Sequence, residues 1–527
     1  MSYAEAIHQL SAMTPELHTQ PGQTRRKFSL TEIGALLAAL GNPQHRFRSV
    51  LIAGTNGKGS TASSLASILQ ASGLRTGMYT SPHLTRPNER IRINNVEISD
   101  DAFARLYFRV HDAGQQLVME QKLGQLPSFF ETLTAMAFLH FADAAIDIAV
   151  LEVGMGGRLD ATNIVDPLLS VITDISLDHT EWLGPTIAAI AREKAGILRP
   201  HGTLITLPQH PEANQVLGEV ATELEVRGVS AVPYMPQTLG ARNASEPAHR
   251  QAQSSYPIHV LGAQITVDSP LQGDHQHRNI ALAIAAAVEL ATRHGFPITP
   301  ASIEQGIHAT QWPGRLEVIT TSHALSQPSR KFHPSSAWVG DHKPAPASTN
   351  PELAPPQVVL DVAHNPAGAW ALRAALRSHF RLGEADAPPA VLVFSCLRDK
   401  PVAEMAQILF PLFDQVIFAP IASARATPTA DLLAAAESVG VPAQAAESVA
   451  EALALALAYP ASETDVAQAA HPIRGAEGRE TPSARAASTA VVVAGSVYLV
   501  GEARPLLLAL TPAQPSLQPS PQMSTKQ

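Results

Sequence analysis

Residues 51–61 of this chain read Leu51-Ile52-Ala53-Gly54-Thr55-Asn56-Gly57-Lys58-Gly59-Ser60-Thr61. The apolar residues that lead into this stretch predict a buried strand, and the apolar spacing after Ser60 predicts a helix. Glycines between them let backbone N–H groups turn toward an anion, and Lys58 adds a positive charge. The stretch therefore predicts a phosphate-binding loop formed by Thr55, Asn56, Gly57, Lys58, Gly59 and Ser60, with the Ser60 hydroxyl facing Mg²⁺. A glycine-rich turn without a ligand is the alternative.

The composition around this loop is that of a globular protein. With 527 residues the chain has room for two to four domains. Acidic and basic residues are interleaved along the sequence and the net charge is −9, so the sequence does not indicate the basic patch typical of a nucleic-acid-binding protein. The single cysteine, Cys396, excludes an intrachain disulfide. Because we find neither a signal peptide nor a membrane-spanning apolar stretch, we expect a cytoplasmic protein without membrane contact.

Two further strand ends carry candidate magnesium ligands. A loop with two prolines follows the second predicted strand, residues 75–80, and Ser81 opens it. Its hydroxyl is either a hard oxygen ligand for Mg²⁺ or an ordinary turn former. The apolar run 146–153 predicts a central parallel strand, and Glu152 lies at its carboxyl end. A carboxylate there, beside a phosphate loop, is suited to Mg²⁺, whereas a salt-bridged or capping glutamate is the alternative.

Other polar residues follow in the same pattern. The strand predicted at 169–175 leads to His179, and a helix is predicted from Pro185 to about Gly196. By residue type alone, His179 indicates a general base or a structural histidine, since imidazole prefers softer metals, and Lys194 indicates a solvated helix charge. The buried strand near residue 360 delivers Asp361 and His364 at its carboxyl end.

Two strings give the chain a family resemblance. These are the loop Gly54-Thr55-Asn56-Gly57-Lys58-Gly59-Ser60 and the longer string Glu152-Val153-Gly154-Met155-Gly156-Gly157-Arg158-Leu159-Asp160-Ala161-Thr162-Asn163. Both resemble the Mur-ligase superfamily, in particular the folylpolyglutamate and dihydrofolate synthases. The resemblance implies an α/β fold, with an N-terminal P-loop ATPase-like domain built on a parallel-rich sheet and a C-terminal Rossmann-like α/β domain.

The resemblance also implies roles for single residues. Ser81 and Glu152 would bind one Mg²⁺, and His179 with a carbamylated Lys194 would bind a second. ATP would be the nucleotide, and a monovalent cation such as K⁺ is a further candidate. Catalytic roles fall on Lys58, Lys194, His179, Asp361 and His364, and nucleotide contacts beyond the loop on Asn279, Arg315 and Asp361.

A pterin site is implied by two other segments. In the family, the segments that match Lys27 to Leu30 and Ser128 to Glu131 contact the pterin substrate. A packing helix is the alternative for the first segment, and core packing is the alternative for Phe129 and Phe130, favoured for one of the two. The expected substrate-binding residues are Lys27, Phe28, Ser29, Leu30, Ser128, Phe129, Phe130, Glu131 and Leu159.

The activity implied is an ATP-dependent amide ligase acting through an acyl phosphate. It would add L-glutamate to dihydropteroate and to the γ-carboxyl of folates such as tetrahydrofolate. The aromatic segment at Ser128 to Glu131 favours both activities in one protein. Alternatives are a monofunctional folylpolyglutamate synthase, a nucleotide-binding module without turnover and a peptidoglycan ligase of the Mur type.

The domain organisation follows the same comparison. We expect an ATP- and pterin-binding domain over residues 1–296 and a glutamate-ligase domain over residues 297–512. Segments rich in Pro, Ser and Ala at about 322–356 and 462–487 predict surface insertions, and 513–527 a disordered tail. A monomer is expected, because family members are commonly monomeric and the sequence has no heptad repeat.

Overall fold

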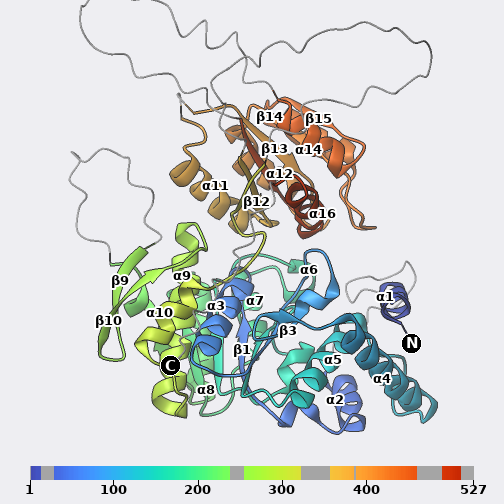
Figure 1. Ribbon diagram of the computed structural model, residues 1–527, viewed down its shortest axis with the longest axis vertical. Coiled ribbons are helices and arrows are strands. Elements are labelled where there is room, and N and C mark those ends of the chain that lie inside the picture. The colour runs from blue at the N-terminus through green and yellow to red at the C-terminus, as the bar shows by residue number, and fades with distance from the viewer. Residues whose placement is uncertain are drawn as a thin grey trace, which may run out of the picture.

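The computed structural model describes residues 2–13, 29–237, 255–321, 357–384, 387–459 and 489–511. It has two α/β halves, each with a central sheet covered by helices (Figure 1). This confirms the predicted fold class. The predicted insertions, the predicted tail and the two residues Lys27 and Phe28 lie outside the described residues.

The first sheet holds the phosphate loop at its centre. Strand β1, which leads into the loop, pairs in parallel with β5 and β6, and all three strands are almost entirely buried, as expected for parallel strands covered on both faces. Only the β2–β3 and β3–β4 pairs are antiparallel in the described sheet. The strand order is β4 (Val96–Glu97), β3 (Ile91–Ile93), β2 (Thr76–Tyr79), β5 (Ile148–Glu152), β1 (Arg48–Ala53), β6 (Leu169–Ile172), β7 (Thr203–Thr206) and β8 (Arg227–Ser230).

Helices cover both faces of this sheet. On one face lie α3 (Lys58–Ala71), α9 (Asp274–His294) and α10 (Pro300–His308), together with the hairpin of β9 (Ser255–Val260) and β10 (Ala263–Asp268). The helices that build the core on the other face are α1 (Tyr3–Ala12), α2 (Leu30–Ala39), α4 (Asp100–Met119), α5 (Phe129–Asp143), α7 (Ile187–Ala195) and α8 (Pro211–Glu223).

The second sheet is parallel except at one edge. Its order is β11 (Glu317–Thr320), β12 (Gln357–Asp361), β16 (Ala490–Ala494), β13 (Ala390–Phe394), β14 (Gln415–Phe418) and β15 (Ala443–Ala445), with β11 antiparallel to β12. One face is covered by α11 (Pro366–Phe380), α12 (Val402–Leu409) and α13 (Thr429–Ser438). The other face is covered by α14 (Val449–Leu457) and α16 (Val497–Leu508).

One helix start differs from the sequence prediction. Helix α7 begins at Ile187 rather than at Pro185, because the Thr186 hydroxyl accepts the Ala189 N–H at 3.1 Å and so caps the helix. Helix α9 begins at Asp274, and Asn279 lies inside this helix.

Helix α10 precedes the passage of the chain into the second half. Helix α10 packs its apolar face on α3, so closely that a side chain at Gly306 would meet the Ile68 backbone at 2.4 Å. The chain enters the second sheet only at β11. Helix α10 therefore belongs to the core of the first half, and the domain start at residue 297 stays a prediction.

Candidate active site

One cavity of about 350 Å³ lies between the two halves, at the carboxyl ends of the central strands. In α/β sheets this is where ligands bind. Every residue that the sequence predicted for the nucleotide, the metals and catalysis lines this cavity. They are Thr55, Asn56, Gly57, Lys58, Gly59, Ser60, Ser81, Glu152, His179, Lys194, Asn279, Arg315, Asp361 and His364.

Backbone hydrogen bonds to Asp174 fix the position of the first residues of the phosphate loop. The N–H groups of Thr55 and Asn56 donate to the carbonyl oxygen of Asp174, at 2.8 and 3.2 Å. Lys58 Nζ donates to the Thr55 carbonyl at 3.1 Å, and Gly57 is the left-handed residue before α3. The loop thus presents a lysine and a helix N-terminus to the cavity, an arrangement that suits phosphate.

Glu152 lies next to the loop that begins at Ser81. The Ser81 N–H donates to Glu152 Oε2 at 3.1 Å. Burial raises the pKa of Glu152, and the charges of Lys58 and Arg315 oppose that rise. No cluster of three His, Cys, Asp or Glu suited to a metal occurs within the described ranges. A cation beside Glu152 would therefore need hydroxyl, phosphate or water oxygens as further ligands.

Lys194 and His179 face the same cavity. Lys194 is 4% exposed, its Nζ donates to the Gly54 carbonyl at 2.6 Å, and burial lowers its pKa to about 7. It is therefore not the solvated helix charge that its residue type indicated. His179 has a left-handed backbone at φ +50°, and burial lowers its pKa to about 4 against the charge of Asp178.

The second half brings three predicted residues to the cavity. Asp361 organises the backbone, because Oδ2 accepts the Leu316 N–H at 2.9 Å and Oδ1 accepts the Ala363 N–H at 2.8 Å. His364 Nδ1 lies 2.8 Å from the Val362 carbonyl, and burial lowers the pKa of this imidazole to about 4. Burial also lowers the pKa of Arg315, against the charges of Asp361 and Glu152.

Polar contacts that the sequence did not predict join the halves. Lys400 Nζ lies 2.6 Å from Asp178 Oδ1, and both side chains are less than a tenth exposed. The Asn365 amide donates to Asp178 at 3.0 Å and exchanges hydrogen bonds with Asn56 at 3.0 and 3.3 Å. The positions of these residues in the sequence could have indicated them. Asp178 follows β6 and Lys400 follows β13, so both lie after the carboxyl ends of parallel strands, as the predicted residues do.

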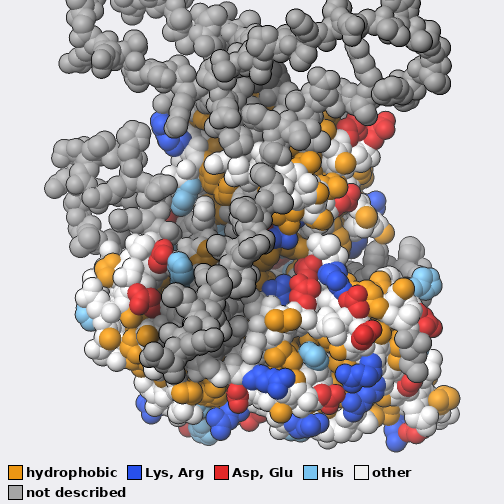
Figure 2. All heavy atoms as spheres, in the orientation of Figure 1, with side chains coloured by type: hydrophobic (Ala, Val, Ile, Leu, Met, Phe, Trp, Pro, Cys, Tyr) orange, Lys and Arg blue, Asp and Glu red, His pale blue; other side chains and the backbone are white. Residues whose placement is uncertain are grey.

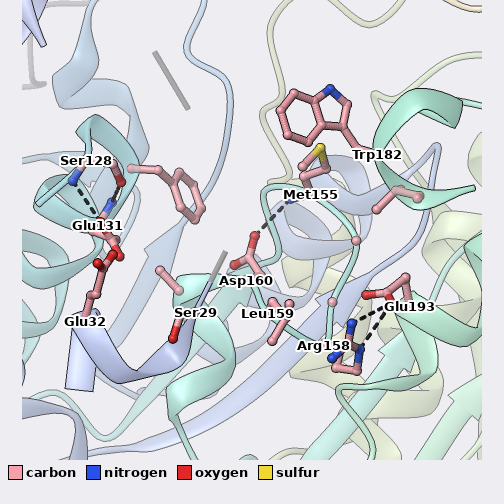
Figure 3. Close-up of a pocket in the computed structure, with 15 residues that line it drawn as sticks. Ser29, Glu32, Ser128, Glu131, Met155, Arg158, Leu159, Asp160, Trp182 and Glu193 are labelled. Carbon is pink, nitrogen blue, oxygen red and sulfur yellow. Dashed lines mark hydrogen bonds and ion pairs between the residues drawn. The ribbon is translucent and has the colours of Figure 1, made fainter. Parts of the chain in front are cut away.

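A second pocket, of about 130 Å³, collects most of the residues predicted for the pterin. Figure 3 shows Ser128 and Glu131 on one side, Trp182 and Arg158 on the other, and Asp160 between them. The predicted residues Ser29, Ser128, Phe130, Glu131 and Leu159 line it. Leu30 and Phe129 are not among its described lining residues, and the Arg90 guanidinium lies 5.2 Å from the centre of the Phe129 ring.

Two acidic residues of this pocket have structural partners. Glu131 forms a capping box with Ser128, in which each side chain accepts the other's N–H, at 2.8 and 3.2 Å. Asp160 accepts the N–H groups of Met155 and Thr162, at 2.9 and 3.0 Å, and burial raises its pKa. The wall of the pocket therefore includes the capped start of α5 and the turn that Asp160 stabilises by its hydrogen bonds.

Two further observations concern the charges on the surface and the length of the helices. Basic and acidic side chains are interspersed over the described face seen in Figure 2. None of the described helices is long and apolar enough to cross a membrane.

Comparisons with known proteins agree with this geometry. The model of the Mur ligase middle domain matches residues 52–287, and that of the Mur ligase glutamate ligase domain matches residues 349–468. A dihydrofolate synthase/folylpolyglutamate synthase of Mycobacterium tuberculosis is 35% identical over 96% of this chain and 94% of its own length.

Solved structures of two such proteins superpose on the chain. The Mycobacterium tuberculosis folylpolyglutamate synthase complexed with ADP and AMPPCP matches with a TM-score of 0.71 and 31% identity, over 96% of this chain and 98% of that one. The Escherichia coli FolC in complex with DHPP and ADP matches with a TM-score of 0.68 and 27% identity, over 97% and 98%.

Proposed function

Because the chain belongs to the Mur ligases and, within them, to the dihydrofolate synthases/folylpolyglutamate synthases, we propose that ligation takes place in the cavity between its two halves. The protein is an ATP-dependent ligase that adds L-glutamate to dihydropteroate and to folates. The mechanism rests on one observation: the phosphate loop, Glu152, Arg315 and His364 all line the same cavity.

A carboxylate is unreactive toward an amine, so its oxygen must first become a better leaving group. In our proposal the substrate carboxylate attacks the γ-phosphorus of ATP, the bond to the β-phosphate oxygen breaks, and ADP and an acyl phosphate form. The glutamate amine then attacks the acyl carbon, loses a proton, and inorganic phosphate departs. Both steps place negative charge on phosphoryl oxygens near Lys58 and Arg315, which favours these steps.

The oxygen donors beside the phosphate loop suit one Mg²⁺ ion, and we propose a second site next to it. Glu152 is a buried carboxylate hydrogen-bonded to the Ser81 backbone, and carboxylate and hydroxyl oxygens are the hard ligands that Mg²⁺ prefers. We assign one site to Ser81 and Glu152 and a second to His179 and Lys194. Bound there, the ions would neutralise charge on the phosphoryl oxygens. A requirement for K⁺ is tested separately, by replacing K⁺ with Na⁺ in the assay.

Lys194 serves as a ligand in this proposal only after its amine has combined with CO₂. The nitrogen attacks the carbon of CO₂, a proton leaves, and the product is an anionic carbamate. Burial lowers the pKa of the Lys194 amine to about 7, which supports the assignment because CO₂ combines with the neutral amine. Carbon-13 NMR of protein equilibrated with labelled CO₂ should give a carbamate signal that Lys194→Met lacks.

The pocket of Ser29, Ser128, Phe130, Glu131 and Leu159 is our candidate pterin site. An aromatic ring at Phe130 suits stacking on a flat heterocycle. We propose Lys27, Phe28, Leu30 and Phe129 as further contacts, although the first two lie outside the described residues. For the whole protein we propose a cytoplasmic location and a monomeric state. Light scattering of the purified chain tests the monomeric state.

The decisive assay measures ADP release with Mg²⁺, ATP and L-glutamate, using dihydropteroate or tetrahydrofolate as acceptor. We expect turnover with both. Turnover with tetrahydrofolate alone would leave polyglutamate extension as the single activity. Binding of ATP without turnover on either acceptor would refute the ligase assignment and favour a nucleotide-binding module.

A further inference from the structure

One glycine of the phosphate loop makes room for a tryptophan from the segment that connects the two halves. Gly59 stands where the common phosphate loop has serine or threonine directly after its lysine. It lies in the first turn of α3 without a left-handed backbone, so its φ does not require glycine, which is otherwise unfavourable in a helix. A side chain at Gly59 would lie 2.6 Å from Cζ2 and 2.9 Å from Cε2 of the Trp312 indole. The close approach of Trp312 therefore accounts for this glycine.

Trp312 is fixed on the first half by further contacts. It lies between α10 and β11 and follows Gln311, whose carbonyl accepts the hydroxyl hydrogen of Ser63 on α3 at 2.9 Å. The Arg92 guanidinium lies 5.7 Å from the centre of the indole ring, a distance typical of a cation–π contact. The ring also packs against the core that α3, α9 and α10 form. The indole is thus held on the helix that begins at the phosphate loop.

The residues that follow Trp312 are fixed on the second half. The Gly314 carbonyl accepts the N–H of Val362, directly after β12, at 3.0 Å. Only Pro313, whose ring fixes φ, separates Trp312 from Gly314, and two residues span at most about 7 Å. Arg315 comes next and lines the cavity between the halves. A displacement of the indole would therefore be passed along this short, stiff segment to Arg315.

We propose that Trp312 is a positioning residue: its indole, seated on Gly59, sets how far Arg315 reaches toward the γ-phosphate of a bound nucleoside triphosphate. This inference rests on the nucleotide binding of the proposed function. Lys58 and Arg315 both stabilise the charged form of the Glu152 carboxylate, so the two cations lie around the same acidic group. Because the lysine of a phosphate loop faces the β- and γ-phosphates, Arg315 serves the same end of the nucleotide.

The test compares ADP with AMPPCP, an ATP analogue that keeps the third phosphoryl group, by calorimetry on the full chain with Mg²⁺. In Trp312→Ala we expect AMPPCP to bind about tenfold more weakly, the loss of one hydrogen bond from a charged donor, and ADP to stay within about twofold of the wild type. Gly59→Ala should act alike, because its methyl group displaces the indole. In the double variant the loss should equal that of Trp312→Ala alone, since the methyl group then meets no ring.

A second pair of variants tests whether Trp312 acts through Arg315. Once Arg315→Met has removed the guanidinium, adding Trp312→Ala should weaken AMPPCP by less than about twofold more. The matched control is Trp370→Ala. Trp370 also has an arginine over its ring, Arg373 at 5.8 Å, but it is exposed and is not among the described residues that line the cavity. This control should bind both nucleotides as the wild type does.

Equal weakening of ADP and AMPPCP in Trp312→Ala would show that Trp312 only supports the fold, and unchanged binding of both would show that the indole is dispensable. Either result overturns the proposal, as does a full further loss when Trp312→Ala is added to Arg315→Met. If Trp312→Ala does not fold, Gly59→Ala decides, and the absence of an AMPPCP-selective loss there overturns the proposal. Binding of neither nucleotide by the wild type would refute the proposed function as well, so the two failures are distinguishable.

Discussion

Gly57 is the residue on which the phosphate loop turns. It has φ +87°, and a side chain there would clash with Asn279 Oδ1. We expect Gly57→Ala to cost about 1–2 kcal/mol of stability from its left-handed backbone. In addition, it should weaken ADP binding by about tenfold, a loss of roughly 1.4 kcal/mol, because Asn279 must move.

Gly73→Ala is the control for this prediction. Gly73 has φ +81° but no atom within 4 Å of an added side chain, so it carries the backbone cost without the clash. Calorimetry and thermal unfolding of both variants separate the two effects. Equal ADP affinity in the two variants would show that contact with Asn279 is unimportant for the nucleotide.

His364 makes stability depend on pH. Its pKa is about 4 in the folded protein, through burial and the charge of Lys400, against about 6.5 for an exposed histidine. Between these values the unfolded chain binds a proton that the folded chain does not. Stability should therefore be complete above pH 6.5 and fall as the pH drops toward 4.

The variant His364→Asn should make that loss smaller. The measured quantity is the difference in Tm between pH 7 and pH 5, compared for the wild type, this variant and His201→Asn, whose parent residue is exposed. An unchanged difference in His364→Asn would mean that protonation of this imidazole does not oppose folding.

At the scale of elements, the contact of α10 with α3 controls where the phosphate loop lies. Gly306 lets the two helices meet backbone to backbone at Ile68, and α3 begins at the loop. We expect Gly306→Ala to force the helices apart and cost about 1–3 kcal/mol, the usual range for overpacking. Gly218→Ala on α8, where an added side chain meets nothing, should stabilise the protein by up to about 1 kcal/mol. Denaturant unfolding measures both, and a stabilised Gly306→Ala would contradict this account.

What the sequence predicted at this scale was local. The loop after β1 and the carboxylate at the end of β5 were predictable, because strand, turn and helix follow one another and parallel strands end at one edge. The partner of α10 was not predictable, because an amphipathic helix fits any apolar face. Lys400 was missed for a related reason: its significance depends on Asp178, which is far away in the chain and is not part of any local pattern.

At the scale of the whole molecule, the buried pair of Lys400 and Asp178 holds the two halves together over the cavity. Burial alone would raise the pKa of Asp178, but the charges of His179 and Lys400 outweigh it and lower that pKa. Removing the cation leaves a buried carboxylate unpaired, which costs about 3–5 kcal/mol unless the carboxylate regains water. Parting of the halves would restore that water.

We therefore expect Lys400→Met to populate an open form. Its radius of gyration by small-angle X-ray scattering should exceed that of the wild type, and ADP formed without glutamate ligation should rise, since an open cavity lets water hydrolyse the acyl phosphate. Lys122→Met, which removes an exposed ion pair within the first half, should change neither quantity. Lower ligation at an unchanged radius and unchanged coupling would instead place Lys400 in the chemistry itself, because a closed cavity that still excludes water leaves only a direct role for the lost charge.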